Sequence, residues 1–259
     1  MEPATEQSAR YPSLIDRAVF ITGGGSGIGA ALVEAFHGQG ARVAFVDIDE
    51  PASQALAARL GERGGHAPFF QRCDLTDIES LRAAIAAAAT ALGAIRVLVN
   101  NAARDDRHSI ESVTPERWDA IMSVNLRHQF FAAQAVIDGM AAAGGGSIVN
   151  MGSISWMIGQ GGMPGYLSAK AAITGLTRAL ARDLGPKNIR VNAVLPGWTM
   201  TERQIKLWLT PEAEADLMAR QCLKRKLMPH HVASMVLFLA AEDSAMCTNQ
   251  SYIVDGGWV

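Results

Sequence analysis

This chain of 259 residues has few cysteines, a small net charge and no long apolar run. The three cysteines (Cys73, Cys222 and Cys247) are odd in number and lack metal-ligand spacing, which argues against a disulfide framework and a bound zinc. The formal net charge of −2 gives no electrostatic case for binding nucleic acid. No segment approaches the roughly 18 uninterrupted apolar residues of a membrane span, and the polar, acidic first dozen residues are not a secretory signal. We therefore expect a cytoplasmic protein without nucleic-acid or membrane partners.

Apolar segments rich in β-branched residues alternate with segments of helical periodicity along most of the chain. Hydrophobic residues make up 49% of the sequence, enough for a large buried core. We predict strands over residues 18–22, 42–47, 67–74, 95–100, 146–151, 189–195 and 251–255. We predict helices over residues 27–39, 52–63, 77–92, 115–142, 166–184 and 230–240. The alternation indicates an α/β fold, a Rossmann-type doubly wound sheet of seven parallel strands flanked by helices.

The chain shows no linker and no internal repeat, so we expect a flexible tail over residues 1–13 followed by a single domain over residues 14–259. One segment, at about residues 200–226, breaks the alternation between the last two strands and contains one or two short helical patterns. An insertion at the carboxyl end of a parallel sheet overhangs the ligand crevice. We therefore predict that this segment is a helical lid over the substrate.

The motif TGGGSGIG, at residues 22–29, follows the first predicted strand and opens a helix. Its glycines at positions 23, 27 and 29 let the backbone turn tightly and approach a pyrophosphate at the helix N-terminus. No Lys-Ser/Thr pair follows, which excludes a triphosphate P-loop. Asp47 ends the second strand about twenty residues later, where a carboxylate accepts hydrogen bonds from ribose hydroxyls and repels a 2′-phosphate. The sequence therefore predicts NAD as the cofactor rather than NADP.

Tyr166 and Lys170 stand four residues apart in GYLSAK, hence on one face of a helix. Such a pair alone is common by chance, so its interpretation depends on the other motifs that occur with it. Ser153 follows the fifth strand in NMGSISW, Asn125 lies in the preceding long helix, and NNAA (residues 100–103) closes the fourth strand. With the glycine motif and the PGW at residues 196–198, this order of motifs resembles the short-chain dehydrogenase/reductase family over nearly the whole chain after the tail.

The resemblance implies hydride transfer by a tetrad of Asn125, Ser153, Tyr166 and Lys170. In that family role Tyr166 is the base, Ser153 holds the substrate oxygen, and Asn125 holds a water that connects Lys170 to solvent. One departure is Ala103, where the family usually has glycine. The cofactor-binding candidates are Gly23, Ser26, Gly27, Ile28, Asp47, Asp74, Leu75, Asn101, Ala102, Tyr166, Lys170, Pro196, Gly197, Trp198 and Thr199.

Tyrosine, with an unperturbed pKa of about 10, is a poor base near neutral pH. A lysine ammonium roughly 4 Å away, at an effective dielectric constant near 20, offers about 4 kcal/mol, close to three pKa units. We therefore expect Lys170 to lower the pKa of Tyr166 into a useful range.

A narrower resemblance concerns the substrate. DDRH (residues 105–108), NLRH (125–128), GSISW (152–156) and QCLK (221–224) are similar to the bacterial NAD-dependent aldose 1-dehydrogenases, which act on D-xylose, galactose or L-sugars. That resemblance implies oxidation of a cyclic sugar at C1 to the lactone. The candidate substrate contacts are Arg104, Asp105, Ser153, Gln160, Tyr166, Arg203 and Gln204.

Two other functions stay open at this point. One is an NAD(P)-dependent ketone or 3-oxoacyl reductase, or another secondary-alcohol dehydrogenase of the same family. The other is a redox sensor that binds the dinucleotide and a protein partner, which the intact Tyr166 and Lys170 disfavour. Family resemblance and the apolar excess of the helices at residues 115–142 and 166–184 predict a homotetramer.

Overall fold

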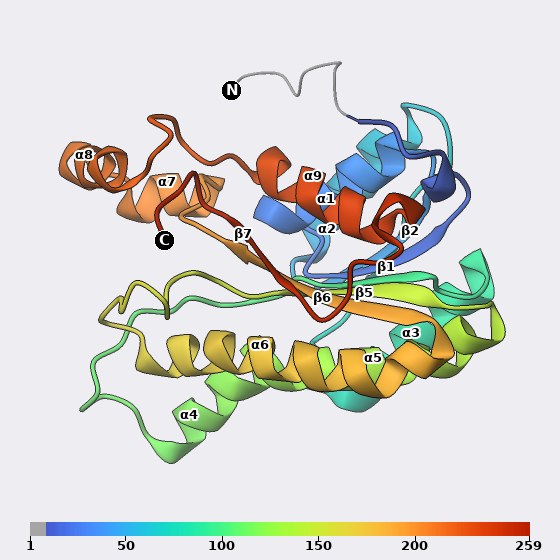
Figure 1. The fold of residues 1–259 in the computed structure, drawn as a ribbon, viewed down its shortest axis with the longest axis horizontal. Helices are drawn as coiled ribbons and strands as arrows, with labels where there is room; N and C mark the ends of the chain where they lie inside the picture. Colours follow the sequence, from blue (N-terminus) through green and yellow to red (C-terminus); the bar gives the residue numbers. More distant parts are fainter. Residues whose placement is uncertain (1–8) are drawn as a thin grey trace.

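A seven-stranded parallel sheet runs through the middle of the protein in the order β3-β2-β1-β4-β5-β6-β7 (Figure 1). The computed structural model describes residues 9–259. Its strands are β1 (Ala18–Thr22), β2 (Arg42–Asp47), β3 (Phe69–Arg72), β4 (Val97–Asn100), β5 (Gly146–Met151), β6 (Ile189–Pro196) and β7 (Ser251–Val254). The Rossmann-type, doubly wound fold predicted from the sequence is confirmed. Strands β2 and β3 extend the sheet on one side of β1, and β4 to β7 extend it on the other side. The order of the strands therefore reverses between β1 and β4, and such a switch point opens a ligand crevice.

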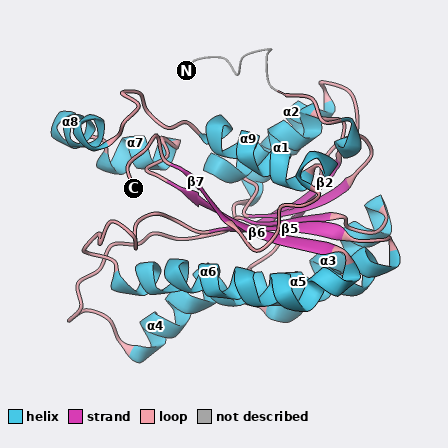
Figure 2. Cartoon of the chain, in the orientation of Figure 1, coloured by secondary structure: helices cyan, strands magenta, loops and turns pink. Residues whose placement is uncertain are grey.

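Helices cover both faces of the sheet, which explains why β1 and β4 are buried at every residue. On one face lie α1 (Gly27–Gly38), α2 (Glu50–Gly61) and α9 (Pro229–Ala240), and on the other α3 (Ile78–Leu92), α4 (Pro115–Met122), α5 (His128–Ala142) and α6 (Pro164–Leu184) (Figure 2). Each face has its own apolar core, with Phe36 and Val236 in one and Leu81 and Met140 in the other.

Several elements differ in extent from the prediction. Strand β3 begins two residues after and ends two residues before the predicted 67–74 span. The predicted helix over 115–142 is interrupted by a π-helical turn at Ser123–Arg127, and this one-residue shift of the hydrogen-bond ladder leaves no trace in the apolar periodicity. Helix α6 begins at Pro164 rather than at residue 166. Proline is tolerated there because the N–H groups of the first helical turn have no acceptor within the helix, so the missing N–H costs no hydrogen bond.

The region predicted as a lid contains α7 (Glu202–Trp208) and α8 (Pro211–Arg220), capped by the side chains of Thr201 and Thr210. Both helices lie beyond the carboxyl end of the sheet (Figure 1). Short 3₁₀ turns stand at Pro12–Leu14, Gly185–Lys187 and Glu242–Ser244.

Residues 1–8 of the predicted tail lie outside the described residues. Residues 9–13 lie against the rest of the chain, since the Tyr11 backbone N–H donates to the Gln39 side chain at 2.9 Å and the adjoining Leu14 is fully buried. Within residues 9–259, no helix is long and apolar enough to cross a membrane, and no cluster of three His, Cys, Asp or Glu side chains could hold a metal ion.

Candidate active site

The carboxyl ends of β1, β2, β4, β5 and β6 open into a cleft of about 920 Å³. Most of the residues predicted from the sequence line it. These are Gly23, Ser26, Ile28, Asp47, Asp74, Leu75, Asn101, Ala102, Arg104, Asp105, Ser153, Gln160, Tyr166, Lys170, Pro196, Gly197, Trp198, Thr199 and Gln204. Three predicted residues, Gly27, Asn125 and Arg203, are absent from the lining.

The glycine loop is packed so closely that only glycine fits at its critical positions. Gly23 has a φ of +66°, and a Cβ there would stand 2.8 Å from the Ala102 Cα. A Cβ on Gly29 would stand 1.7 Å from the Gly23 carbonyl oxygen, and the Asn101 side chain donates to that same oxygen at 2.8 Å. Gly27 also has a positive φ, of +56°. These contacts hold the loop against the N-terminus of α1, where the helix can bind a pyrophosphate.

Two carboxylates stand in the cleft next to this loop. Asp47 accepts hydrogen bonds from the backbone N–H groups of Gly25, at 2.8 Å, and Asp49, at 3.0 Å. Asp74 accepts from the backbone and the hydroxyl of Thr76. Ala103 does not have the positive φ that would require glycine, so its methyl group is accommodated. The residues present therefore fit a dinucleotide, with Asp47 fixed where the adenosine ribose would lie.

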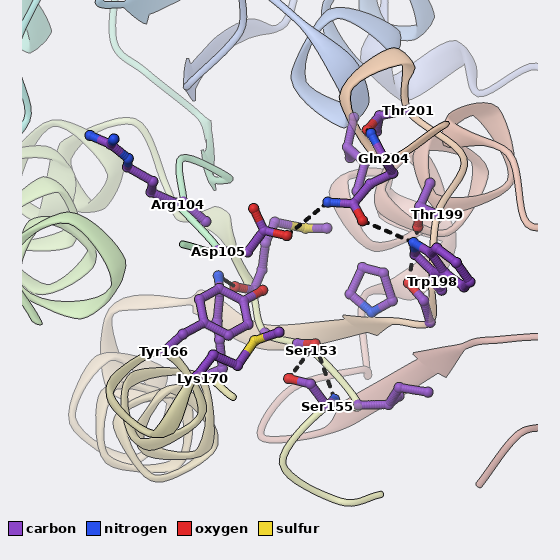
Figure 3. Close-up of a pocket in the computed structure, with 18 of the residues that line it drawn as sticks. Arg104, Asp105, Ser153, Ser155, Tyr166, Lys170, Trp198, Thr199, Thr201 and Gln204 are labelled. Carbon is purple, nitrogen blue, oxygen red and sulfur yellow. Dashed lines mark hydrogen bonds between the residues drawn. The ribbon is translucent and has the colours of Figure 1, made fainter. Parts of the chain in front are cut away.

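Tyr166, Ser153 and Lys170 meet at the other end of the cleft (Figure 3). The Ser153 side chain and the Tyr166 phenol line the same part of the cleft, and the Ser153 hydroxyl donates to the Ser155 hydroxyl at 2.9 Å. Ser155, a residue that the sequence analysis missed, returns a hydrogen bond from its backbone N–H to the Ser153 oxygen. The Lys170 ammonium donates to the Met151 carbonyl at 2.7 Å and lies 5.7 Å from the centre of the Tyr166 ring.

The comparisons with known proteins agree with this geometry. A family model described as "Enoyl-(Acyl carrier protein) reductase" matches residues 23–259. The chain belongs to the short-chain dehydrogenase/reductase family. It is 55% identical to the "Probable galactose dehydrogenase" of Rhizobium meliloti (strain 1021), over 98% of this chain and 99% of that protein. It is 50% identical to the D-xylose 1-dehydrogenase of Caulobacter vibrioides (strain NA1000 / CB15N), over 97% and 99%.

A solved structure of a short-chain type dehydrogenase/reductase from Mycobacterium ulcerans superposes with a TM-score of 0.90 at 26% identity, covering 95% of this chain and 90% of the other. The resemblance inferred from the motifs is thus confirmed, and the protein is an oxidoreductase. Its Tyr166, Ser153 and Lys170 come from the segment after β5 and the first turns of α6.

In this short-chain dehydrogenase, the Asn125 side chain is hydrogen-bonded to backbone groups of the protein. Asn125 is 1% exposed and lies in the π-helical turn. Its side-chain oxygen accepts from the Arg104 N–H at 2.9 Å, and its NH₂ group donates to the carbonyls of Arg104 and Ile121. The side chain therefore fixes the start of the loop that follows β4.

The electrostatics of Tyr166 have the opposite sign from the expectation. Burial, followed by the charge of Asp105, raises the pKa of Tyr166 to about 12, against opposing effects from the Ser153 hydrogen bond and Arg107. Burial lowers the pKa of Lys170 to about 7. A lysine that is half neutral at pH 7, and whose N–H is directed at Met151, does not lower the pKa of the phenol as a full ammonium would.

The end of the cleft lined by Asp105, Trp198 and Gln204 is polar and bridged by hydrogen bonds. Gln204 on α7 donates to the Asp105 carboxylate at 2.7 Å and accepts from the Trp198 indole N–H at 2.9 Å. Arg203 lies 3.6 Å from the Asp105 carboxylate, but its side chain is 56% exposed. Arg104 points away from the cleft centre (Figure 3) and pairs with Asp106.

Arg107 also lines the cleft, and the sequence analysis missed it. Arg107 stands in the DDRH motif, but only the conformation of the loop places its side chain on the cleft side.

Proposed function

We propose that this protein is an NAD-dependent aldose 1-dehydrogenase that oxidises a cyclic sugar at C1 to the lactone. The observation that carries the proposal is that Tyr166, Ser153 and Lys170 line one cleft, whose free end is lined by polar side chains. The galactose and D-xylose dehydrogenases with about half their residues identical support a sugar as the substrate.

Asp47 supports NAD over NADP. Its carboxylate is held by the backbone N–H groups of Gly25 and Asp49, where it would accept from ribose hydroxyls and repel a 2′-phosphate. Gly23, Ser26, Ile28, Asn101 and Ala102 would hold the remainder of the dinucleotide, with Thr199 and its neighbours at the nicotinamide end. When bound there, NAD supplies the acceptor for the hydride that leaves C1.

The side chains of the protein would transfer the proton and stabilise the charge that develops on the sugar oxygen. Tyr166 accepts the proton of the C1 hydroxyl as the hydride departs, so it must first lose its own proton. Lys170, with a pKa of about 7, is neutral in half of the molecules at pH 7 and can take up a proton. Ser153 donates to the sugar oxygen, on which negative charge develops. Asn125 acts as a positioning residue through the Arg104 backbone.

A homotetramer is the assembly that we propose. An apolar groove between α4, α5 and α6 is lined by residues that include Met122, Leu126, Phe130 and Leu176, and the Phe130 side chain is 41% exposed. Such apolar surface is typical of a subunit interface. The three cysteines are free thiols, which supports the reducing cytoplasm as the location.

A panel of pentoses, hexoses and 6-deoxy sugars, each with NAD and with NADP, tests the proposal. Initial rates are read from the absorbance of the reduced cofactor. We expect turnover with at least one aldose, faster with NAD than with NADP. A wild-type enzyme that is inactive with every aldose, yet reduces 3-oxoacyl or other ketone substrates with NADPH, would establish the reductase function instead.

A further inference from the structure

The loop between β4 and α4 directs alternate side chains to opposite sides. Arg104 and Asp106 share the outer side, where they form an ion pair at 2.6 Å. Asp105 and Arg107 share the other side and line the cleft. Asp105 and Arg107 thus place an acceptor and a donor two residues apart on the same cleft.

Both ends of this loop are fixed. At its start, the Arg104 backbone N–H and carbonyl are both bonded to the Asn125 side chain. At its end, the His108 backbone donates to the Gly162 carbonyl at 2.8 Å, and the His108 ring accepts from the Gly165 N–H at 3.2 Å. Because the loop is held at Asn125 and at the start of α6, Asp105 and Arg107 are preorganised for a ligand.

The Arg107 side chain has no polar partner within the part of the chain that the structure describes. Its guanidinium lies over the Trp208 ring of α7, 4.9 Å from the ring centre, and its buried Nε has no hydrogen-bond acceptor. Stacking on an aromatic face fixes the plane of a guanidinium but uses none of its N–H groups. Arg107 therefore lines the cleft with a buried Nε–H that has no acceptor, and such a donor is costly unless a ligand supplies one.

We propose that Arg107 and Asp105 are the specificity-determining pair of the cleft, in which Arg107 donates to one hydroxyl oxygen of the substrate and Asp105 accepts from a neighbouring hydroxyl. The inference rests on the proposed aldose dehydrogenase function and names two neighbouring hydroxyls as the part of the substrate that this pair recognises. A hydroxyl both donates and accepts hydrogen bonds, so two adjacent hydroxyls match an acceptor and a donor side by side. The Gln204 amide, bonded to Asp105, shares that acceptor with the sugar.

The pair favours a neutral sugar over a sugar acid or sugar phosphate. Arg107 alone would suit an anion. Asp105, however, is 21% exposed, and its charge acts on both Tyr166 and Lys170, so it faces the same space. A substrate anion bound beside Asp105 would be repelled by it, whereas a neutral polyol satisfies both residues.

The test uses the aldose that the wild-type enzyme oxidises best, together with its monodeoxy analogues, each lacking one ring hydroxyl. The variants are Arg107→Met, which removes the guanidinium and keeps an unbranched apolar side chain, Arg107→Lys, and Asp105→Asn. Arg63→Met is the control, since Arg63 is exposed and absent from the cleft lining. NADH affinity, measured by fluorescence, and the melting temperature are followed for every variant.

We expect Arg107→Met to lower kcat/KM for the parent sugar by about 10- to 100-fold, mainly through KM, since a hydrogen bond to a charged group is lost. The wild type should discriminate against one monodeoxy analogue by a similar or larger factor, and Arg107→Met should lose that discrimination. Asp105→Asn should do the same at a neighbouring hydroxyl. NADH affinity should be unchanged in all variants, and Arg63→Met should behave as wild type.

Three outcomes would overturn the inference. If wild type oxidises an aldose and Arg107→Met discriminates among the deoxy analogues as wild type does, only the assignment of Arg107 and Asp105 is wrong. If wild type prefers a uronate or a sugar phosphate and Arg107→Met loses that preference, Arg107 binds an anion. If wild type oxidises no aldose at all, the proposed function fails first.

Discussion

Lys170 is buried at 1% exposure, and this burial should make the stability of the protein depend on pH in a way that one substitution removes. Burial lowers the pKa of Lys170 from 10.5 in its unperturbed state to about 7. Between these two values the unfolded chain binds a proton that the folded protein does not, so the free energy of unfolding rises with pH. The destabilisation is fully present below pH 7 and is relieved as the pH rises toward 10.5.

The magnitude follows from the two pKa values. One pKa unit corresponds to about 1.4 kcal/mol. Between pH 7 and pH 9 the folded lysine goes from half to fully neutral while the unfolded lysine stays charged, so Lys170 adds about 2 kcal/mol to the free energy of unfolding over this interval. Lys170→Met, which replaces the ammonium by an apolar group of similar length, should lack this increment.

Urea unfolding at pH 7 and pH 9, at one protein concentration because an oligomer's stability depends on it, measures the effect. Wild type should gain about 2 kcal/mol more than Lys170→Met between the two pH values. Lys187→Met, at an exposed position, is the matched control and should follow wild type. An equal gain in wild type and Lys170→Met would refute the reasoning, because the folded lysine would then keep its ordinary pKa.

Two substitutions test the cofactor site. Gly29→Ala places a Cβ 1.7 Å from the Gly23 carbonyl oxygen and should lower the melting temperature and abolish NADH binding by fluorescence, whereas Gly38→Ala, which meets no atom within 4 Å, should leave both unchanged. Normal NADH affinity in Gly29→Ala would contradict the packing of the loop. Asp47→Ala removes the carboxylate that repels a 2′-phosphate and should raise the ratio of kcat/KM for NADP to that for NAD by at least about tenfold. An unchanged ratio would mean that Asp47 does not select the cofactor.

The fold could be predicted because its determinants are local. Apolar β-branched runs mark strands buried on both faces, and the glycine motif marks the first crossover, so the order of elements follows from the sequence. Boundaries depended on single residues. Asp49, whose side chain accepts from the Ala52 N–H, starts α2 before the predicted residue 52. The π-helical turn at Ser123–Arg127 arises where Asn125 bonds to a loop distant in sequence, which periodicity cannot show.

The residues of the site were largely predictable, but their electrostatics were not. The sequence places Tyr166 and Lys170 on one face of a helix, yet it contains neither the burial of both groups nor the Met151 carbonyl that binds the lysine. Burial, followed by the charge of Asp105, reverses the expected direction of the tyrosine pKa. Arg107 was missed for a related reason. The direction of each side chain in an irregular loop depends on where the loop is held, here at Asn125 and His108.

The most direct test of the central claim is Tyr166→Phe, which removes the phenolic oxygen and leaves the ring. Turnover with the best aldose and NAD should fall to background, while NADH affinity and melting temperature stay close to those of wild type. An enzyme that still reduces NAD at a rate near that of wild type without this oxygen would contradict the assignment of Tyr166 as the base.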